Sequence, residues 1–379
     1  MHRFSDMPIA AGCNLSARRP KLSELTPYFN LITENMKLKH LLLIAALPMA
    51  MTISAQEQAE GTSPLKKYVI GFYNLENLFD TIDSPDTDDS QFLPDGGYQW
   101  TGFKYKNKIK NMSYAISKFP KELAVLGVSE IENEEVIKDL VSQPILADRN
   151  LKTICIEGPD RRGVDVGMIY DADVFTPTNI VSHHLRYELA KPFISRDQLC
   201  VTGLLDGEQI HVIVLHWPSK YGGEKVSTPK RNDAALTTKW ICDSIFAIEP
   251  EAKIVIMGDL NDDPNTECIQ KYLGAKHDRN QMQPGEIYNP CYNIYKSGTG
   301  TLGYQDVWCL YDQVMVSTPW LDKSDLSTLT YWKSEIFNRD FLKEQSGKRK
   351  GYPKRTHTAG TWTNGYSDHF PSLIWVVKK

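Results

Sequence analysis

The sequence predicts an α/β fold in which strands and helices pack in layers. Short apolar runs typical of strands alternate along the chain with amphipathic segments typical of helices. One run, Lys253–Met257 (KIVIM), is almost entirely apolar, which is typical of a central strand covered on both faces. The chain of 379 residues shows no internal repeat and no linker-like stretch of low complexity. We therefore expect residues 56–379 to form one domain.

Each further strand candidate is a short apolar run bounded by polar or turn-forming residues. These runs are Tyr68–Asn74, Ala124–Ser129, Val164–Tyr170, Cys200–Leu205, His211–Leu215, Leu310–Val316 and Ser372–Val377. Two helices are predicted between them. Apolar residues recur at helical spacing from Ile109 until Pro120, which stops the first helix. Asn232 or Asp233 is expected to cap a second helix that continues to about Phe246.

The segment Met36–Ala55 (MKLKHLLLIAALPMAMTISA) has the composition of a secretory signal peptide. It starts with two lysines, continues with an apolar run and ends at small residues before Gln56. The apolar run is too short to favour a transmembrane helix. We expect residues 1–55 to be an upstream extension plus signal peptide. The mature chain is then exported, to the periplasm or the extracellular space, and has no transmembrane segment.

The charge of the remaining chain argues against broad, non-specific affinity for nucleic acid. Residues 1–55 hold 6 of the 43 basic and 3 of the 47 acidic residues, which leaves residues 56–379 with a net charge of −7. Proteins that bind DNA or RNA without sequence preference are normally basic. The charge does not exclude a nuclease whose site recruits cations.

Acidic and amide side chains stand at the ends of several predicted strands. Strand ends on one edge of a sheet meet in space, and ligand sites in α/β proteins gather there. Carboxylates brought together repel one another unless a cation neutralises them. Oxygen ligands favour hard ions, so the sequence predicts Mg²⁺, with Mn²⁺ or Ca²⁺ as possible substitutes, rather than Zn²⁺. The residues concerned are Asn74, Glu76, Glu130, Asp259, Asn261, Asp312, Asp368 and His369.

The dipeptide Asp368-His369, just before the last predicted strand, suits metal-assisted or acid/base chemistry. One side chain can hold a cation while the other moves a proton. An imidazole held by a carboxylate keeps one tautomer and a raised pKa. Asp312 with His369 is the first candidate pair of this kind, and Asp165 with His216 is the second.

These residues fall in seven motifs that occur in the order typical of the endonuclease/exonuclease/phosphatase superfamily, which the chain resembles from about Tyr68 to its end. This superfamily contains pancreatic-type deoxyribonucleases, abasic-site endonucleases, inositol-polyphosphate 5-phosphatases and bacterial sphingomyelinases. The resemblance implies a four-layer sandwich of two mixed β-sheets packed face to face and flanked by helices. The motifs are NLEN (74–77), SEIEN (129–133), RGVDVGMIY (162–170), LHWPSKYGG (215–223), GDLND (258–262), YDQ (311–313) and YSDHFP (366–371).

The resemblance also implies which residues bind the metal ion and the phosphate. Glu130 is expected to be the main metal ligand, and Asp368 and Glu76 are expected to help directly or through water. Asn74 is expected to position the ion or a phosphate oxygen. Asn261 is expected to contact the phosphate and is counted with the catalytic residues.

Four further residues are expected to be catalytic by the same resemblance. His369, paired with Asp312, would act at the phosphorus opposite the leaving group or hold the leaving oxygen. Asp259 would orient or deprotonate the attacking water, and His216 would face the phosphate; which histidine is acid and which is base stays open. The residues alone add Arg355, at the end of the basic run KRKGYPKR, because a guanidinium fork fits two phosphate oxygens.

The first functional hypothesis is a Mg²⁺-dependent hydrolase that breaks phosphodiester bonds by in-line attack of water, as a monomeric nuclease. The family resemblance and the histidine of the HWPS sequence favour nucleic acid as the partner. The second hypothesis is a phosphatase or phosphodiesterase acting on inositol phosphates or phospholipid head groups, because WPSKYGG resembles phosphatase-like members. A third is a non-catalytic binding module on the same fold.

Overall fold

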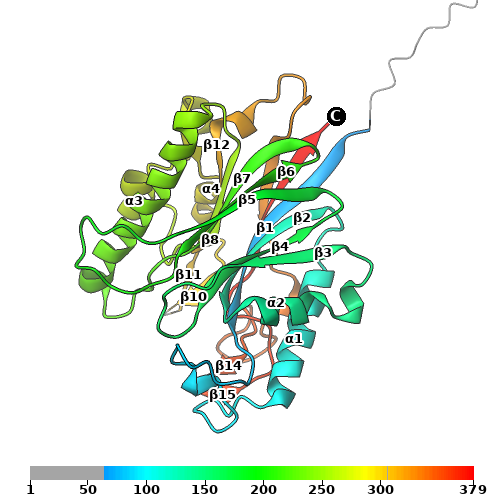
Figure 1. The fold of residues 1–379 in the computed structure, drawn as a ribbon, viewed down its shortest axis with the longest axis vertical. Helices are drawn as coiled ribbons and strands as arrows, with labels where there is room; N and C mark the ends of the chain where they lie inside the picture. The colour runs from blue at the N-terminus through cyan, green and yellow to red at the C-terminus, as the bar shows by residue number, and fades with distance from the viewer. Residues whose placement is uncertain (1–63, 305) are drawn as a thin grey trace, which may run out of the picture. The chain divides into compact units, whose positions relative to one another are not determined.

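The protein is described by a computed structural model that covers residues 64–304 and 306–379. The predicted signal peptide at Met36–Ala55 lies outside these residues. Within them, two large β-sheets pack face to face, and helices lie against their outer faces (Figure 1). This architecture confirms the predicted four-layer α/β sandwich. None of the helices in the described residues has the length and apolar character needed to cross a membrane.

Each sheet contains six strands, one pair of which is parallel. The first sheet runs, in spatial order, β13 (Thr330–Ile336), β16 (Ser372–Lys378), β1 (Lys66–Leu78), β2 (Leu123–Ile131), β4 (Asp165–Asp171) and β3 (Leu151–Cys155). The second runs β5 (Phe175–His183), β6 (Gln198–Leu205), β7 (Glu208–His216), β8 (Ile254–Asp259), β12 (Asp312–Ser317) and β9 (Ile287–Tyr288). The parallel pairs are β1 with β2 and β7 with β8, so both sheets are mixed, as predicted.

Helices and short hairpins complete the described chain. The α-helices are α1 (Gly102–Ser117), α2 (Glu134–Val141), α3 (Glu224–Ile248) and α4 (Cys291–Lys296). The small strand pairs are β10 (Leu302–Tyr304) with β11 (Val307–Cys309) and β14 (His357–Thr358) with β15 (Thr361–Trp362). Short helical turns occupy Ser90–Phe92, Pro144–Leu146, Cys268–Leu273, Arg279–Gln281, Thr318–Leu321 and Asp340–Leu342.

Alternating side chains of β1 explain why this strand lies between two apolar layers. Ile70 and Phe72 point into the core between the two sheets. Val69 and Tyr73 point to the opposite face, where α1 and α2 pack. All four side chains are fully buried, and each such burial stabilises the fold by roughly 1.5–3 kcal/mol. β8 has the same alternation and lies between β7 and β12, which confirms the predicted central strand.

The predicted start of the second helix is wrong. Helix α3 begins at Glu224, more than two turns before Asn232 and Asp233. The carboxylate of Asp233 is buried inside the helix and accepts three backbone hydrogen bonds from residues 188–190. A residue type that favours helix caps is therefore used here to hold a neighbouring loop.

The sandwich brings the polar strand ends to one edge. Asp259 ends β8 and pairs in register with Asp312, which begins the antiparallel strand β12. His216 ends the parallel neighbour β7 and pairs in register with Asp259. The ends of β1 and β2 in the other sheet carry Asn74 and Glu130, which meet this edge through hydrogen bonds described below.

Candidate active site

The amide of Asn74 joins a carboxylate of its own sheet to one of the opposite sheet. Its Nδ2 donates to Glu130 Oε1 and to Asp259 Oδ2, at 3.1 Å in each case. The backbone N–H of Asn77 donates to the second oxygen of Glu130 at 3.0 Å. Asn74 is fully buried, so this amide holds the two carboxylates in fixed positions.

Two histidines flank the carboxylate of Asp259. The Nε2 atoms of His216 and His369 each lie 3.8 Å from Asp259 Oδ2. His369 Nδ1 is hydrogen-bonded to Asp312 Oδ2 at 2.7 Å, so the first pair considered from the sequence is formed. The second pair is not formed, and that hypothesis is wrong. Asp165 instead accepts a hydrogen bond from the backbone of Gly158.

The other two predicted metal ligands surround a guanidinium group. Arg355 Nη2 donates to Asp368 Oδ2 at 2.5 Å, and Arg355 Nε lies 4.0 Å from Glu76 Oε1. Glu76 also accepts a hydrogen bond from the backbone N–H of Thr356. The second oxygen of Asp368 lies 3.8 Å from His369 Nε2. Asp368 therefore links the Arg355 cluster to the histidines.

Two sets of side chains have the geometry to share a metal ion. Glu130, His216 and Asp259 form one set, and Asp259, Asp312 and His369 form the other. In each set the possible ligand atoms lie within 4.8 Å of one another. Carboxylate-rich sets of this kind fit a hard divalent cation. Among the three predicted ligands, Glu130 belongs to such a set, whereas Glu76 and Asp368 face Arg355.

A cavity of about 380 Å³ opens over these residues. It is lined by Glu130, Asp259 and Asp368 together, so the three carboxylates share one cleft. Its wall also includes cationic and amide side chains, namely Arg162, Arg196, Lys220 and Asn261.

Asn261 is held at the rim of this cavity by two hydrogen bonds. Its backbone N–H donates to Asp259 Oδ1 at 2.9 Å, and its Nδ2 donates to the carbonyl of Trp217 at 3.0 Å. The same carbonyl accepts a hydrogen bond from Arg196, which is buried and also pairs with Asp160. Arg196 was not predicted as a site residue, because a single arginine in a loop gives no signal in the sequence.

Lys108 is a buried cation that was not predicted either. Its ammonium group donates to Thr356 Oγ1 and to the carbonyl of Tyr366, both at 2.5 Å. Burial lowers the pKa of Lys108 to about 8, although the charges of Glu76 and Asp368 oppose the shift. A signal existed, because Lys108 lies four residues before Met112 on the apolar face of α1.

The surroundings shift the pKa values of the two histidines in opposite directions. Burial, together with the charges of Arg196 and Arg162, lowers the pKa of His216 well below its usual value. Burial also disfavours the charged form of His369, but nearby carboxylates, Asp312 first, raise its pKa well above the usual value. These opposite shifts favour the protonated form of His369 and the neutral form of His216.

Two carboxylic acids near the cavity have raised pKa values. Burial raises the pKa of Asp259 to about 7, with further contributions from Asp312 and Glu130 and opposition from His369. Burial, followed by the charge of Asp368, raises the pKa of Glu76 to about 7. A bound cation would relieve both effects.

Backbone strain collects at the same place. Glu76, Asn77, Glu130 and Asn261 have φ angles of 48°, 55°, 56° and 49°, in the region that favours glycine. Each such non-glycine residue costs roughly 1–3 kcal/mol and persists where the surrounding contacts impose it. Side-chain patterns in the sequence give no warning of this strain.

A comparison with protein families gives the class of this protein. A model of the Endonuclease/Exonuclease/phosphatase family matches residues 69–378. The chain therefore belongs to the endonuclease/exonuclease/phosphatase family, and by its family it acts on phosphate esters. No curated protein sequence matches the chain.

Several solved structures share the fold at low sequence identity. The endonuclease/exonuclease/phosphatase from Bacteroides vulgatus has a TM-score of 0.50 and 13% identity, covering 83% of this chain and 100% of that chain. A humanized D. rerio TDP2 has a TM-score of 0.50 and 9% identity, covering 82% and 98%. At these identities the similarity concerns the fold alone.

Proposed function

We propose that the protein is a divalent-metal-dependent phosphodiesterase that uses water as the nucleophile, with nucleic acid as its substrate. One observation supports a diester most strongly. Asp368 lines three cavities, of about 380, 330 and 200 Å³. A phosphate bound beside Asp368 therefore has room for a substituent on two ester oxygens.

The candidate metal ligands are Glu130, Asp368 and Glu76, with Mg²⁺ as the expected ion and Mn²⁺ or Ca²⁺ as substitutes. Asn74 orients Glu130 through the hydrogen bond described above. When bound, the ion neutralises charge on the phosphate oxygens during attack. The raised pKa of Glu76 and the shared carboxylate cleft support a cation here.

The protonation states divide the acid and base roles between the histidines. His369, held as a cation by Asp312, donates a proton to a phosphate oxygen or to the leaving oxygen. Asp259 and the neutral His216 remain to orient the water and accept its proton. Asn261 and Arg355 contact the other phosphate oxygens in this proposal.

A substrate panel tests the proposal. The full chain is assayed on plasmid DNA, RNA, a generic phosphodiester, a phosphomonoester, an inositol phosphate and sphingomyelin, each with Mg²⁺ and with EDTA. We expect diester cleavage that EDTA abolishes, and a fall of at least roughly 10²–10³-fold in kcat/KM for Glu130→Gln. Glu135→Gln, on the exposed face of α2, is the matched control. Full activity of Glu130→Gln would contradict the site assignment.

A phosphomonoesterase acting on inositol phosphates or lipid head groups is the second candidate. Arg162, Arg196 and Lys220 line the cavity, and a multiply charged phosphate would be attracted by them. Cleavage of monoesters without cleavage of diesters in the same panel would select this candidate. Binding of substrates without any turnover would select the non-catalytic module.

We also propose that residues 1–55 are an extension plus signal peptide and that residues 56–379 act as one exported, monomeric domain. The composition of Met36–Ala55 supports export. Expression with a fractionation assay and N-terminal sequencing tests this: the exported protein should start near Gln56. Retention of an uncleaved chain in the cytoplasm would contradict it.

A further inference from the structure

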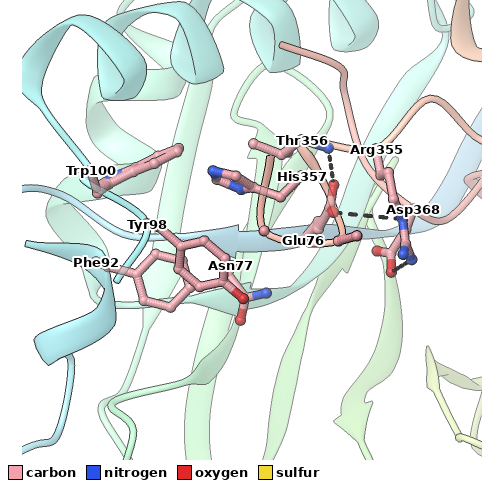
Figure 2. A pocket seen from close by; sticks show the side chains of 11 residues that line it. Glu76, Asn77, Phe92, Tyr98, Trp100, Arg355, Thr356, His357 and Asp368 are labelled. Carbon is pink, nitrogen blue, oxygen red and sulfur yellow. Dashed lines mark hydrogen bonds and ion pairs between the residues drawn. The ribbon is translucent and has the colours of Figure 1, made fainter. Parts of the chain in front are cut away.

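A second cavity, of about 330 Å³, lies on the other side of Glu76 and Asp368 (Figure 2). Its wall is formed by the rings of Phe92, Tyr98, Trp100 and His357, which we call the aromatic wall. Three of these rings come from the segment between β1 and α1, and His357 comes from β14. None of the four residues belongs to the motifs that carry the predicted site.

Contacts with Phe79 hold two rings of the aromatic wall in place. Phe92 stacks on Phe79 with ring centroids 4.2 Å apart and planes 5° from parallel. Trp100 is fully buried, and its indole N–H donates to the carbonyl of Phe79 at 2.9 Å. Phe92 and Tyr98 remain partly exposed to the cavity. A fixed flat surface of this kind binds a planar ring with little loss of side-chain entropy.

Polar groups stand beside the rings. The Nε2 atom of His357 is buried and has no hydrogen-bond partner in the part of the chain that the structure describes. A buried polar atom without a partner is unusual and calls for a ligand or water. Asn77 lines the same cavity as Tyr98 (Figure 2). Rings for stacking, with an imidazole and an amide for edge contacts, form the chemistry that binds a heterocyclic base.

The aromatic cavity adjoins the proposed phosphate site at one shared residue, Asp368. Asp368 lines both cavities, and its second oxygen faces His369. A ring held against the aromatic wall would therefore belong to a group attached to a phosphate beside Asp368.

Aromatic cages also bind quaternary ammonium groups, and the local charge favours a heterocyclic base over such a group here. The carboxylates of Glu76 and Asp368 line the same cavity, but Arg355 pairs with both of them. On the aromatic side, Lys104 and Lys108 lie close enough to His357 to disfavour its cation. These positive charges oppose a choline head group more than a neutral base.

We propose that the aromatic wall binds the nucleobase next to the scissile phosphate and so makes this enzyme select nucleotide diesters. This inference rests on the proposed function. Stacking acts equally on substrate and transition state, so the selection is expressed in KM rather than kcat.

The kinetic test uses thymidylyl-thymidine and its two analogues with an abasic deoxyribose on the 5′ or the 3′ side. For the unchanged protein, loss of one of the two bases should raise KM roughly 5- to 100-fold, the range for one base–aromatic stack. Tyr98→Leu, which keeps an apolar side chain but no ring, should raise KM for the intact substrate and remove the difference. Tyr98→Phe should retain it. Tyr114→Ala, a tyrosine on α1 outside the cavity, is the matched control.

A binding test does not depend on turnover. Calorimetry should show thymidine monophosphate binding roughly 5- to 100-fold more tightly than deoxyribose 5-phosphate, and Tyr98→Leu should remove this preference. Equal binding of the two, or tighter binding of phosphocholine, would overturn the aromatic-wall proposal. Diester hydrolysis that ignores the bases would also overturn it while leaving the proposed function intact. Base-dependent binding without hydrolysis of any diester would instead contradict the proposed function.

Discussion

The two histidines of the site lie at the same distance from the same carboxylate, yet their surroundings differ. Each Nε2 is 3.8 Å from Asp259 Oδ2, and each residue is 6% exposed. The carboxylates of Asp312, Asp368 and Asp259 surround His369. His216 also lies 3.8 Å from Glu130 and Asp259, but the guanidinium groups of Arg196 and Arg162 act on it as well and lower its pKa. Because burial is equal, the opposite directions of the two pKa shifts follow from the neighbouring charges.

This difference gives one residue type two chemical roles. Pairs of titratable groups whose surroundings push their pKa values apart are suited to divide acid and base work. Asp259 between them has a pKa raised to about 7, so it can exchange protons near neutral pH. The first three predictions below change the neighbours of one of these two histidines at a time.

Asp312→Asn should have the largest effect. It removes the carboxylate that holds His369 Nδ1 at 2.7 Å. We expect kcat to fall roughly 10²–10⁴-fold, the range for loss of an acid or base catalyst. The pKa of His369 should fall as well, and because its protonated form acts below that pKa, the alkaline limb of the pH–rate profile should move to lower pH.

The measurement is kcat/KM against pH for the unchanged protein, for Asp312→Asn and for the exposed control Asp173→Asn. An alkaline limb that stays in place in Asp312→Asn, with activity retained, would show that His369 does not act as the acid.

Arg196→Gln should have a smaller effect on the opposite half of the site. It removes the buried cation that, after burial itself, lowers the pKa of His216 most. The pKa of His216 should rise, and because its neutral form acts above that pKa, the acid limb of the profile should move to higher pH. If the pKa rises by about 1, the rate on that limb falls about tenfold at a given pH.

Arg162→Gln tests whether exposure to solvent weakens the effect of a guanidinium group on the pKa of His216. The Arg162 side chain is 57% exposed, against 7% for Arg196, so solvent screens its charge more. Its effect on the acid limb should be the weaker of the two. The reverse order would contradict the electrostatic explanation.

Substitution of His357 should have the smallest effect, and this effect concerns the stability of the fold. Burial, with the charges of Lys104 and Lys108, lowers its pKa to about 4. Below about pH 6.5 the unfolded chain takes up a proton that the folded chain refuses, so this residue lowers stability as the pH falls from about 6.5 through about 4. His357→Gln should weaken that acid dependence in thermal melts across this window. His277→Gln, on an exposed histidine, should leave it unchanged, and identical melts for both variants would contradict the lowered pKa of His357.

The order of apolar runs was enough to predict the strands that build the site. Strand-end polar groups such as Asn74 and Asp259 meet because the sheet edge brings strand ends together, which a pattern can anticipate. The pairing of Arg355 with Asp368 depends on how a long loop returns over the site. Sequence periodicity does not predict where a loop packs. The prediction that Arg355 binds phosphate therefore depended on the chemistry of its guanidinium group alone.

The aromatic wall was missed for a related reason. Phe92, Tyr98 and Trp100 lie in an acidic segment that carries Gly and Pro, where no repeat indicates which side chains share a face. Positive φ angles at Glu76 and Glu130 were equally unpredictable, because local sequence favours other conformations there.

Anomalous diffraction from crystals soaked in Mn²⁺ would test the cation site itself. Our account predicts an ion bonded to a carboxylate oxygen of Glu130, at roughly 2.1 Å, within the cavity that Asp259 and Asp368 also line. The ion should be absent from Glu130→Gln crystals prepared in the same way. A protein active with Mn²⁺ whose ion lies away from Glu130, or persists unchanged in the variant, would contradict the account.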